Sequence, residues 1–317
     1  MTCVSQLLSA AVSRLKTAGS DEPEANAEWL LAYALGVSRT WVLANGFENV
    51  PAEKQIQFES FLVRKERGEP LSHIVGFQPF CGLDIRVTPD VLTPRPETED
   101  LVEQVSSCFD KKGRYAFLDM CTGSGCIALA LARNFPNAQV LAVDKSEVAL
   151  KVAQENAREH RLTERVHFLQ SDLWENVMGT FDLIISNPPY IPFGAGKIPP
   201  DISRAAARHE LNGGIFEFCS AASRILAPGG RFFCVFRAER LTDLTAALKA
   251  SGLSPKTMTF VHHNTKCPPA MILTEALKGN ATLKITRPLF LYRERHVLTE
   301  DAEKIYDDCS FEGFLNE

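Results

Sequence analysis

From residue 115 onward the chain alternates apolar segments with amphipathic ones, and this pattern constrains the fold more than any other feature of the sequence. Short apolar segments typical of buried strands cover 115–120, 140–144, 166–170, 181–186 and 231–236. Helix-like spacing of apolar residues lies between them, for example over 125–133 and 146–160. After residue 252 the chain becomes strand-rich, with strand patterns at 256–262, 271–277 and 283–292. Strand–helix alternation of this length predicts an α/β domain whose mostly parallel sheet has helices on both faces.

Two stretches of different character precede this domain. Residues 1 to about 70 contain three amphipathic helical patterns and predict a small helical bundle. The stretch from Gly68 to Pro96 holds five Pro and three Gly, with short strand patterns at 77–80 and 83–87, which predicts a β-hairpin. We therefore expect a helical domain over 1–70, a β-hairpin linker over 71–100 and the α/β domain over 101–317.

The composition limits the classes of protein to which the chain can belong. Its 45% apolar and 23% charged residues are typical of a folded globular chain. No apolar run approaches the roughly 18 residues of a membrane span, and the N-terminus lacks the pattern of a signal peptide. The nine cysteines form no CxxC pair and no Cys/His cluster with zinc-ligand spacing. We expect a cytoplasmic protein with reduced thiols, no metal site and no membrane partner.

The first strand pattern of the α/β domain runs into a glycine-rich turn that opens a helix. Glycines let a ligand approach the backbone closely, and a helix N-terminus favours polar or anionic groups. The turn comprises Cys121, Thr122, Gly123, Ser124 and Gly125. Its Gly-x-Gly-x-x-Ala spacing suits the nucleoside of a methyl-donor cofactor and also fits a nicotinamide dinucleotide, so the turn alone leaves both open.

Of three acidic residues near this turn, two favour S-adenosylmethionine over a dinucleotide, and Asp144 suits the ribose of either. Asp119 lies four residues before Gly123, where it suits the ammonium group of a methionine and would repel a pyrophosphate. Asp144 ends the next strand and can accept both hydroxyls of a ribose. Asp172 closes the third strand, where it can accept from an adenine amine while Leu173 lies against the ring.

The fourth strand pattern is followed by Asn187, Pro188, Pro189 and Tyr190. The two prolines remove two backbone donors, which leaves the Asn187 carboxamide oxygen and the Pro188 carbonyl as acceptors. Both can accept from one planar NH2 group while Tyr190 stacks on a flat acceptor. An amide-type nitrogen is a poor nucleophile because its lone pair is delocalised. Holding both N–H groups out of plane directs that lone pair toward a sulfonium methyl, so positioning and electrostatics replace a strong base.

These residues carry a resemblance to known families. The Asn-Pro-Pro-Tyr motif with Asp119, the glycine turn and Asp144 resembles the amino-methyltransferases that use S-adenosylmethionine. More narrowly, residues 1–190 resemble the bacterial release-factor glutamine methyltransferases (the HemK/PrmC family). The matching segments outside the turn and the motif are Arg67–Pro70, Gly76–Phe77 and Val91–Glu99, which includes the run Pro-Arg-Pro-Glu-Thr-Glu.

The resemblance implies a fold, a cofactor and a substrate. The fold is a seven-stranded, Rossmann-like methyltransferase domain behind an N-terminal helical bundle and a β-hairpin linker. The helical domain would recognise the substrate, and the α/β domain would bind S-adenosylmethionine and catalyse transfer. The substrate implied is the glutamine in the Gly-Gly-Gln loop of a peptide chain release factor.

Residues 186–308 depart from this pattern. Four of their segments, Ile202–Leu211, Arg237–Leu241, Pro255–Lys256 and Pro288–Tyr292, are similar to the tRNA adenine amino-methyltransferases of the TrmN type. Between 187 and 296 the chain has 15 Lys and Arg against 7 Asp and Glu, so a contact with tRNA or ribosomal RNA remains open. We expect release-factor glutamine as the acceptor, with tRNA adenine as the alternative. A nicotinamide-dependent oxidoreductase and a catalytically inactive binding module are more distant alternatives.

Overall fold

The computed structural model describes residues 2–188, 214–294 and 297–303. These residues divide into two compact units, Met1–Phe77 and Gln78–Glu317. None of the helices within the described ranges is long and apolar enough to cross a membrane.

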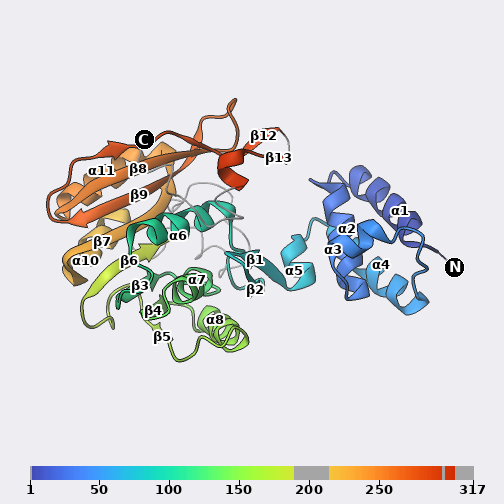
Figure 1. The fold of residues 1–317 in the computed structure, drawn as a ribbon, viewed down its shortest axis with the longest axis horizontal. Helices are drawn as coiled ribbons and strands as arrows, with labels where there is room; N and C mark the ends of the chain where they lie inside the picture. Colours follow the sequence, from blue (N-terminus) through green and yellow to red (C-terminus); the bar gives the residue numbers. More distant parts are fainter. Residues whose placement is uncertain (1, 189–213, 295–296, 304–317) are drawn as a thin grey trace. The chain divides into compact units, whose positions relative to one another are not determined.

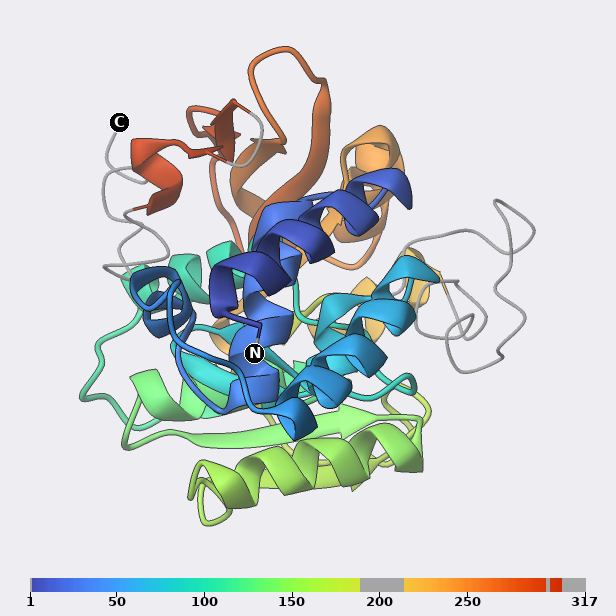
Figure 2. The ribbon, with the colours of Figure 1, turned by 90° about the vertical axis from the view of Figure 1, so that its right-hand side faces the viewer.

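The first unit is a bundle of helices, as its amphipathic patterns predict (Figures 1 and 2). Its helices are α1 (Val4–Thr17), α2 (Pro23–Leu35), α3 (Arg39–Ala44), α4 (Ala52–Glu66) and α5 (Leu71–Val75). Helix α2 begins at a proline and ends at Gly36, whose φ of 73° is in the left-handed region that suits a helix C-terminus. The core between the helices includes Leu15, Leu30 and Leu62, all buried.

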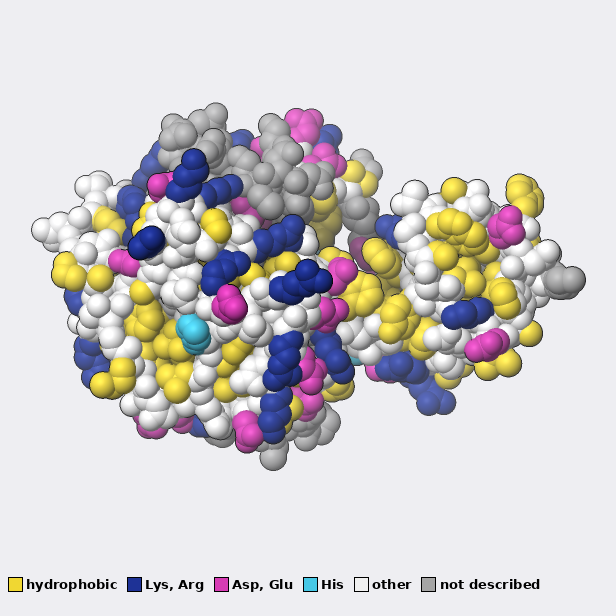
Figure 3. All heavy atoms as spheres, turned by 60° about the horizontal axis from the view of Figure 1, so that its bottom comes forward, with side chains coloured by type: hydrophobic (Ala, Val, Ile, Leu, Met, Phe, Trp, Pro, Cys, Tyr) yellow, Lys and Arg dark blue, Asp and Glu magenta, His cyan; other side chains and the backbone are white. Residues whose placement is uncertain are grey.

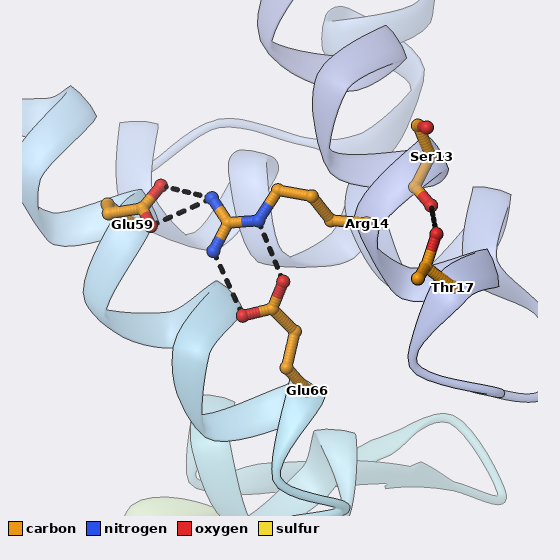
Figure 4. A network of polar contacts seen from close by, with 5 residues as sticks. All are labelled: Ser13, Arg14, Thr17, Glu59 and Glu66. Atoms are coloured by element: carbon orange, nitrogen blue, oxygen red, sulfur yellow. Dashed lines mark hydrogen bonds and ion pairs between the residues drawn. The ribbon is translucent and has the colours of Figure 1, made fainter.

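An arginine joins two helices of this unit (Figure 4). Arg14 Nε donates to Glu66 Oε1 at 2.7 Å, and Nη2 donates to Glu66 Oε2 at 2.9 Å. Arg14 Nη1 also donates to both carboxylate oxygens of Glu59, each at 2.8 Å. The two carboxylates raise the pKa of Arg14 further above its usual range. Because these side chains are partly exposed, the network orients α1 on α4 more than it stabilises the unit.

The segment expected as a linker contains regular structure. It includes α5, strands β1 (Phe77–Phe80) and β2 (Leu83–Arg86), and the start of helix α6 (Pro96–Cys108). The two strands form a two-stranded sheet, which confirms the predicted hairpin. Asn156 holds strand β2 to the rest of the second unit, because its Oδ1 accepts from the Arg86 N–H at 2.8 Å and its Nδ2 donates to the Arg86 carbonyl at 3.1 Å.

The second unit is built on a large, mainly parallel sheet (Figure 1). Its long strands are β3 (Ala116–Met120), β4 (Gln139–Asp144), β5 (Val166–Gln170), β6 (Phe181–Ser186), β7 (Leu226–Arg237), β8 (Leu253–His262) and β9 (Pro269–Lys278). They lie in the order β8-β9-β7-β6-β3-β4-β5, and β9 is antiparallel to both of its neighbours. Two short strands, β10 (Lys284–Ile285) and β11 (Leu289–Phe290), pair with β8. Strands β12 (Tyr292–Glu294) and β13 (Val297–Leu298) form a separate pair.

Helices cover both faces of this sheet, as the alternation predicts. Helix α6, α7 (Cys126–Asn134) and α8 (Glu147–Glu159) pack on one face, and α10 (Ile215–Ile225) and α11 (Leu241–Ala250) on the other. Successive strand residues point to opposite faces: Phe117 belongs to the first core and Leu118 to the second. Within the second unit the α/β fold of the prediction is thus confirmed.

Candidate active site

The predicted site residues follow four neighbouring strands at one edge of the sheet. Strands β6, β3, β4 and β5 are parallel and adjacent, so their carboxyl ends meet at that edge. The chain crosses from β3 to β4 and β5 on one side and later returns to β6 on the other. Ligands of open α/β sheets bind at such a reversal of strand order. Asn187 and the glycine turn lie on its two sides.

The glycine turn has the backbone conformation that its glycines predict. Gly123 and Gly125 have φ of 56° and 82°, both in the left-handed region. A Cβ on Gly125 would lie 2.9 Å from Ala153 Cβ on α8, so a larger residue would separate the turn from that helix. The Thr122 N–H donates to the Val143 carbonyl at 3.0 Å, and Asn156 Nδ2 donates to the Ser124 carbonyl at 2.9 Å. The turn is therefore held from β4 and from α8.

Asp119 lies under this turn with one carboxylate oxygen in use. Its Oδ2 accepts from Thr122 Oγ1 at 2.5 Å and from the Ala128 N–H at 3.1 Å. Its Oδ1 is buried and has no hydrogen-bond partner among the described residues. Burial raises the pKa of Asp119 to about 7, an effect that its two hydrogen bonds only partly offset.

Asp144 organises the rim of the site. Its Oδ2 accepts from the Gly123 N–H at 2.8 Å, and its Oδ1 accepts from the Ser146 N–H at 2.9 Å. Burial raises the pKa of this carboxyl as well. The Lys145 N–H also bonds to this carboxylate, but a carboxylate has about four acceptor sites, so Asp144 can hold the turn and still accept from a ligand hydroxyl.

Asp172 and Leu173 follow β5 on the far side of Asp144. Asp172 Oδ2 is paired with Lys145 Nζ, and both side chains remain partly exposed. Leu173 adopts a φ of 51°, a conformation that β-carbon sterics disfavour. Its side chain packs partly buried against the core on the α10 face.

Asn187 provides an oriented carboxamide at the end of β6. Its Nδ2 donates to Thr98 Oγ1 on α6 at 3.0 Å. Its Oδ1 is buried and has no hydrogen-bond partner within the described ranges. Pro188 is buried directly behind it, and Ser186 Oγ donates to the Met120 carbonyl at 2.6 Å, which ties the end of β6 to β3. Pro189 and Tyr190 lie outside the described residues.

Three contacts of the site were not anticipated from the sequence. They are the bonds of Thr98 to Asn187, of Lys145 to Asp172 and of Asn156 to the glycine turn. The contact of Lys145 with Asp172 could have been predicted, because Lys145 directly follows Asp144 at the same edge of the sheet. Thr98 had only an indirect signal, its place in the Pro-Arg-Pro-Glu-Thr-Glu run.

About half of the basic side chains that the structure describes in residues 187–296 pair with carboxylates. Six Lys and Arg side chains contact carboxylates: Arg231 and Lys256 with Glu275, Arg237 with Glu239, Arg240 with Asp243, Arg287 with Asp301, and Arg293 with Glu300. On the face of the whole chain shown in Figure 3, Lys and Arg side chains are interspersed with Asp and Glu side chains. Lys197, Arg204, Arg208 and Arg295 lie outside the described residues. In the described part, no group of three or more His, Cys, Asp and Glu side chains could hold a metal ion.

The chain is similar to known proteins over both units. The family model of the PrmC N-terminal domain matches residues 6–76, and that of the methyltransferase small domain matches residues 99–251. A release factor glutamine methyltransferase of Caulobacter vibrioides is 36% identical over 252 residues, which cover 77% of this chain and 87% of that protein. One of Moorella thermoacetica is 40% identical over 233 residues, covering 71% of this chain and 82% of that protein.

A solved structure supports the fold of the second unit. A predicted O-methyltransferase from Agrobacterium tumefaciens superposes with a TM-score of 0.53 at 19% identity, over 66% of this chain and 96% of that one. The two family models match the helical unit and the part of the second unit that carries Asp119, the glycine turn and Asn187. The chain belongs to the family of release factor glutamine methyltransferases.

Proposed function

We propose that this chain uses S-adenosylmethionine to methylate the side-chain nitrogen of the glutamine in the Gly-Gly-Gln loop of a peptide chain release factor. The observation that carries the proposal is Asn187 Oδ1, a buried acceptor without a partner in the described structure, at the switch point beside the glycine turn. The names of the curated relatives support the choice of substrate. The proposal includes a cytoplasmic location, where release factors act.

The residues around the glycine turn fit S-adenosylmethionine. Asp119 Oδ1, an orphaned buried acceptor, suits the ammonium group of its methionine part. The turn Cys121–Gly125 offers close approach of the backbone, and Asp144 would accept from the ribose hydroxyls. Asp172 would accept from the adenine amine, with Leu173 against the ring. When bound, the cofactor supplies a methyl group on a sulfonium centre.

The chain itself orients the glutamine amide and accepts hydrogen bonds from its N–H groups. Asn187 Oδ1 and the Pro188 carbonyl would accept from the two N–H groups of the glutamine amide, while Tyr190 would stack on its plane. Held in this way, the nitrogen lone pair points at the methyl group, and the surplus proton leaves the nitrogen after transfer. Because this requires no strong base, the catalytic residues proposed are Asn187, Pro188, Pro189 and Tyr190.

Adenine of tRNA presents the same planar NH2, so the motif alone admits both acceptors. Phosphate binding needs unpaired clustered cations, whereas six of the described basic side chains in 187–296 are paired with carboxylates. Release-factor glutamine is therefore the acceptor we favour. Any contact of this segment with RNA is an outcome of the test below.

Methyl transfer from radiolabelled S-adenosylmethionine, offered a release factor and bulk tRNA side by side, tests the proposal. We expect label in the release factor, and none in a variant whose Gly-Gly-Gln glutamine is replaced by alanine. Label in tRNA alone would contradict release-factor glutamine as the acceptor. Tight NADH binding without S-adenosylmethionine binding would contradict the assignment as a methyltransferase. Binding of a partner without any methyl transfer would indicate an inactive binding module.

A further inference from the structure

The run Pro94–Glu99 marks the family resemblance, yet neither the cofactor nor the acceptor chemistry assigns it a role. In the structure this run forms the start of α6, with Pro96 at its first position. Thr98 lies in the first turn and is only 2% exposed. Its hydroxyl oxygen accepts from Asn187 Nδ2 at 3.0 Å, which joins residues 89 positions apart in the sequence.

A carboxamide can be turned by 180°, which exchanges its oxygen and its nitrogen with little change of shape. Only one of the two orientations presents an oxygen to an incoming NH2 group, and the other presents N–H groups that would repel it. Thr98 Oγ1 binds the Asn187 nitrogen and so leaves Oδ1 as the atom that faces away from α6. That oxygen is buried and unpaired in the described structure, and leaving it so destabilises the fold until a donor arrives.

The hydroxyl of Thr98 is itself held in place by a rigid element. The Thr98 N–H donates to the Arg95 carbonyl at 2.9 Å. In the same helical turn, Glu99 Oε2 accepts from the Cys81 N–H of the hairpin at 3.0 Å. One turn further, Leu101, Val102 and Val105 are fully buried against the sheet. A group on such a helix positions its neighbour more precisely than a group on a loop would.

We propose that Thr98 is a positioning residue, which fixes the Asn187 carboxamide with its oxygen directed at the acceptor nitrogen. The proposal rests on the function proposed above, since it deepens the role of Asn187 in that site. Thr98 acts through Asn187 and contacts neither cofactor nor acceptor in this account. It gives the Thr of the Pro-Arg-Pro-Glu-Thr-Glu run a physical role.

The test compares two variants of Thr98 in the full chain, one that keeps the shape of the side chain and one that keeps its hydroxyl. Thr98→Val removes the hydroxyl and should lower kcat for release-factor methylation about tenfold, the equivalent of one lost hydrogen bond. The KM for the release factor and the Kd of S-adenosylmethionine should stay within about twofold, because binding surfaces are kept. Thr98→Ser keeps the hydroxyl and should restore most of kcat. A KM or Kd effect as large as the kcat effect, or no rescue by Thr98→Ser, would overturn the proposal.

Thr274→Val is the matched control. Thr274 is fully buried in β9, and its Oγ1 has no hydrogen-bond partner among the described residues. Its removal should leave kcat unchanged, so that a fall in both variants would show a general effect of losing a buried hydroxyl.

A second measurement is independent of activity. In chain labelled with 15N-asparagine, the side-chain amide signals of Asn187, assigned through their absence in Asn187→Ala, should shift and exchange faster in Thr98→Val. They should stay near their native positions in Thr98→Ser. Unchanged signals in Thr98→Val would overturn the inference. Absence of methyl transfer by the native chain would instead overturn the proposed function, while these signals still decide the contact.

Discussion

At the scale of single residues, the site combines anchored atoms with unsatisfied ones. Asp119 uses Oδ2 to hold the glycine turn and keeps Oδ1 unpaired, and Asn187 uses Nδ2 and keeps Oδ1 unpaired, both within the described structure. An unpaired buried acceptor destabilises a fold by about 1–3 kcal/mol. In the proposed function, these two atoms at one edge of the sheet are the places where cofactor and acceptor supply the missing donors.

The raised pKa of Asp119 predicts how cofactor binding depends on pH. With a pKa of about 7, the carboxyl is largely neutral below pH 7 in the unliganded chain. An ammonium group favours the ionised form, so binding at lower pH must release a proton. The Kd of S-adenosylmethionine should therefore rise as pH falls from about 7 to about 5.5, approaching tenfold per pH unit. Isothermal titration calorimetry at several pH values measures this slope.

Two variants show whether Asp119 causes the slope. Asp119→Asn cannot titrate, so its weaker binding should be nearly independent of pH over this range. Burial raises the pKa of Glu99 to about 7 as well, so it would titrate in the same range. Glu99→Gln should keep the native slope. A slope that disappears in Glu99→Gln and persists in Asp119→Asn would show that Glu99, and not Asp119, is the titrating group.

At the scale of elements, a buried ionic cluster joins the strands on the antiparallel side of the sheet. Glu275 on β9 is fully buried and accepts from Arg231 Nη1 at 2.6 Å and from Lys256 Nζ at 3.2 Å. Its Oε2 also accepts from Thr257 Oγ1 at 3.2 Å. Gln104 Nε2 donates to the same hydroxyl oxygen of Thr257 at 3.2 Å, which connects α6 to the cluster. The cluster therefore links β7, β8, β9 and the helix that carries Thr98.

Removing this carboxylate should destabilise the second unit. Glu275→Gln leaves Arg231 and Lys256 without their counter-charge, and we expect the free energy of unfolding to fall by about 2–4 kcal/mol. Glu239→Gln, which removes the exposed partner of Arg237, should change it by less than about 1 kcal/mol. Urea denaturation of both variants measures the difference. Equal effects would show that burial does not determine the strength of the Glu275 cluster.

The sequence predicts elements better than it predicts contacts between them. Strand patterns at 140–144 and 166–170 match β4 and β5 closely, because burial of local apolar runs determines both. The single strand expected at 283–292 was wrong in detail. The structure divides it into β10, β11 and the start of β12, and Pro288, which has no N–H to donate to a ladder, lies between β10 and β11. The hydrogen bond between Thr98 and Asn187 could not be predicted from the sequence, because it depends on how α6 packs and not on any local pattern.

At the scale of the whole molecule, folding brings basic and acidic segments of the sequence together as ion pairs. Two arginines of the basic segment 187–296 pair with carboxylates that follow the segment, Arg287 with Asp301 and Arg293 with Glu300. Excess of basic residues in a segment therefore overstates the charge that its surface offers to an RNA. The family match spans the helical unit and the catalytic unit alike, which agrees with a protein acceptor recognised by more than the motif.

The central claim is that Asn187 presents its oxygen to the glutamine nitrogen of a release factor while the glycine turn holds the methyl donor. Tandem mass spectrometry of a release factor incubated with the chain and S-adenosylmethionine tests it most directly, alongside the cofactor Kd of native and Asn187→Ala chains. The account predicts a methyl group on the Gly-Gly-Gln glutamine side chain, none with Asn187→Ala, and cofactor Kd values within a few-fold of each other. A methyl group at another residue, undiminished transfer by Asn187→Ala, or loss of cofactor binding in that variant would contradict it.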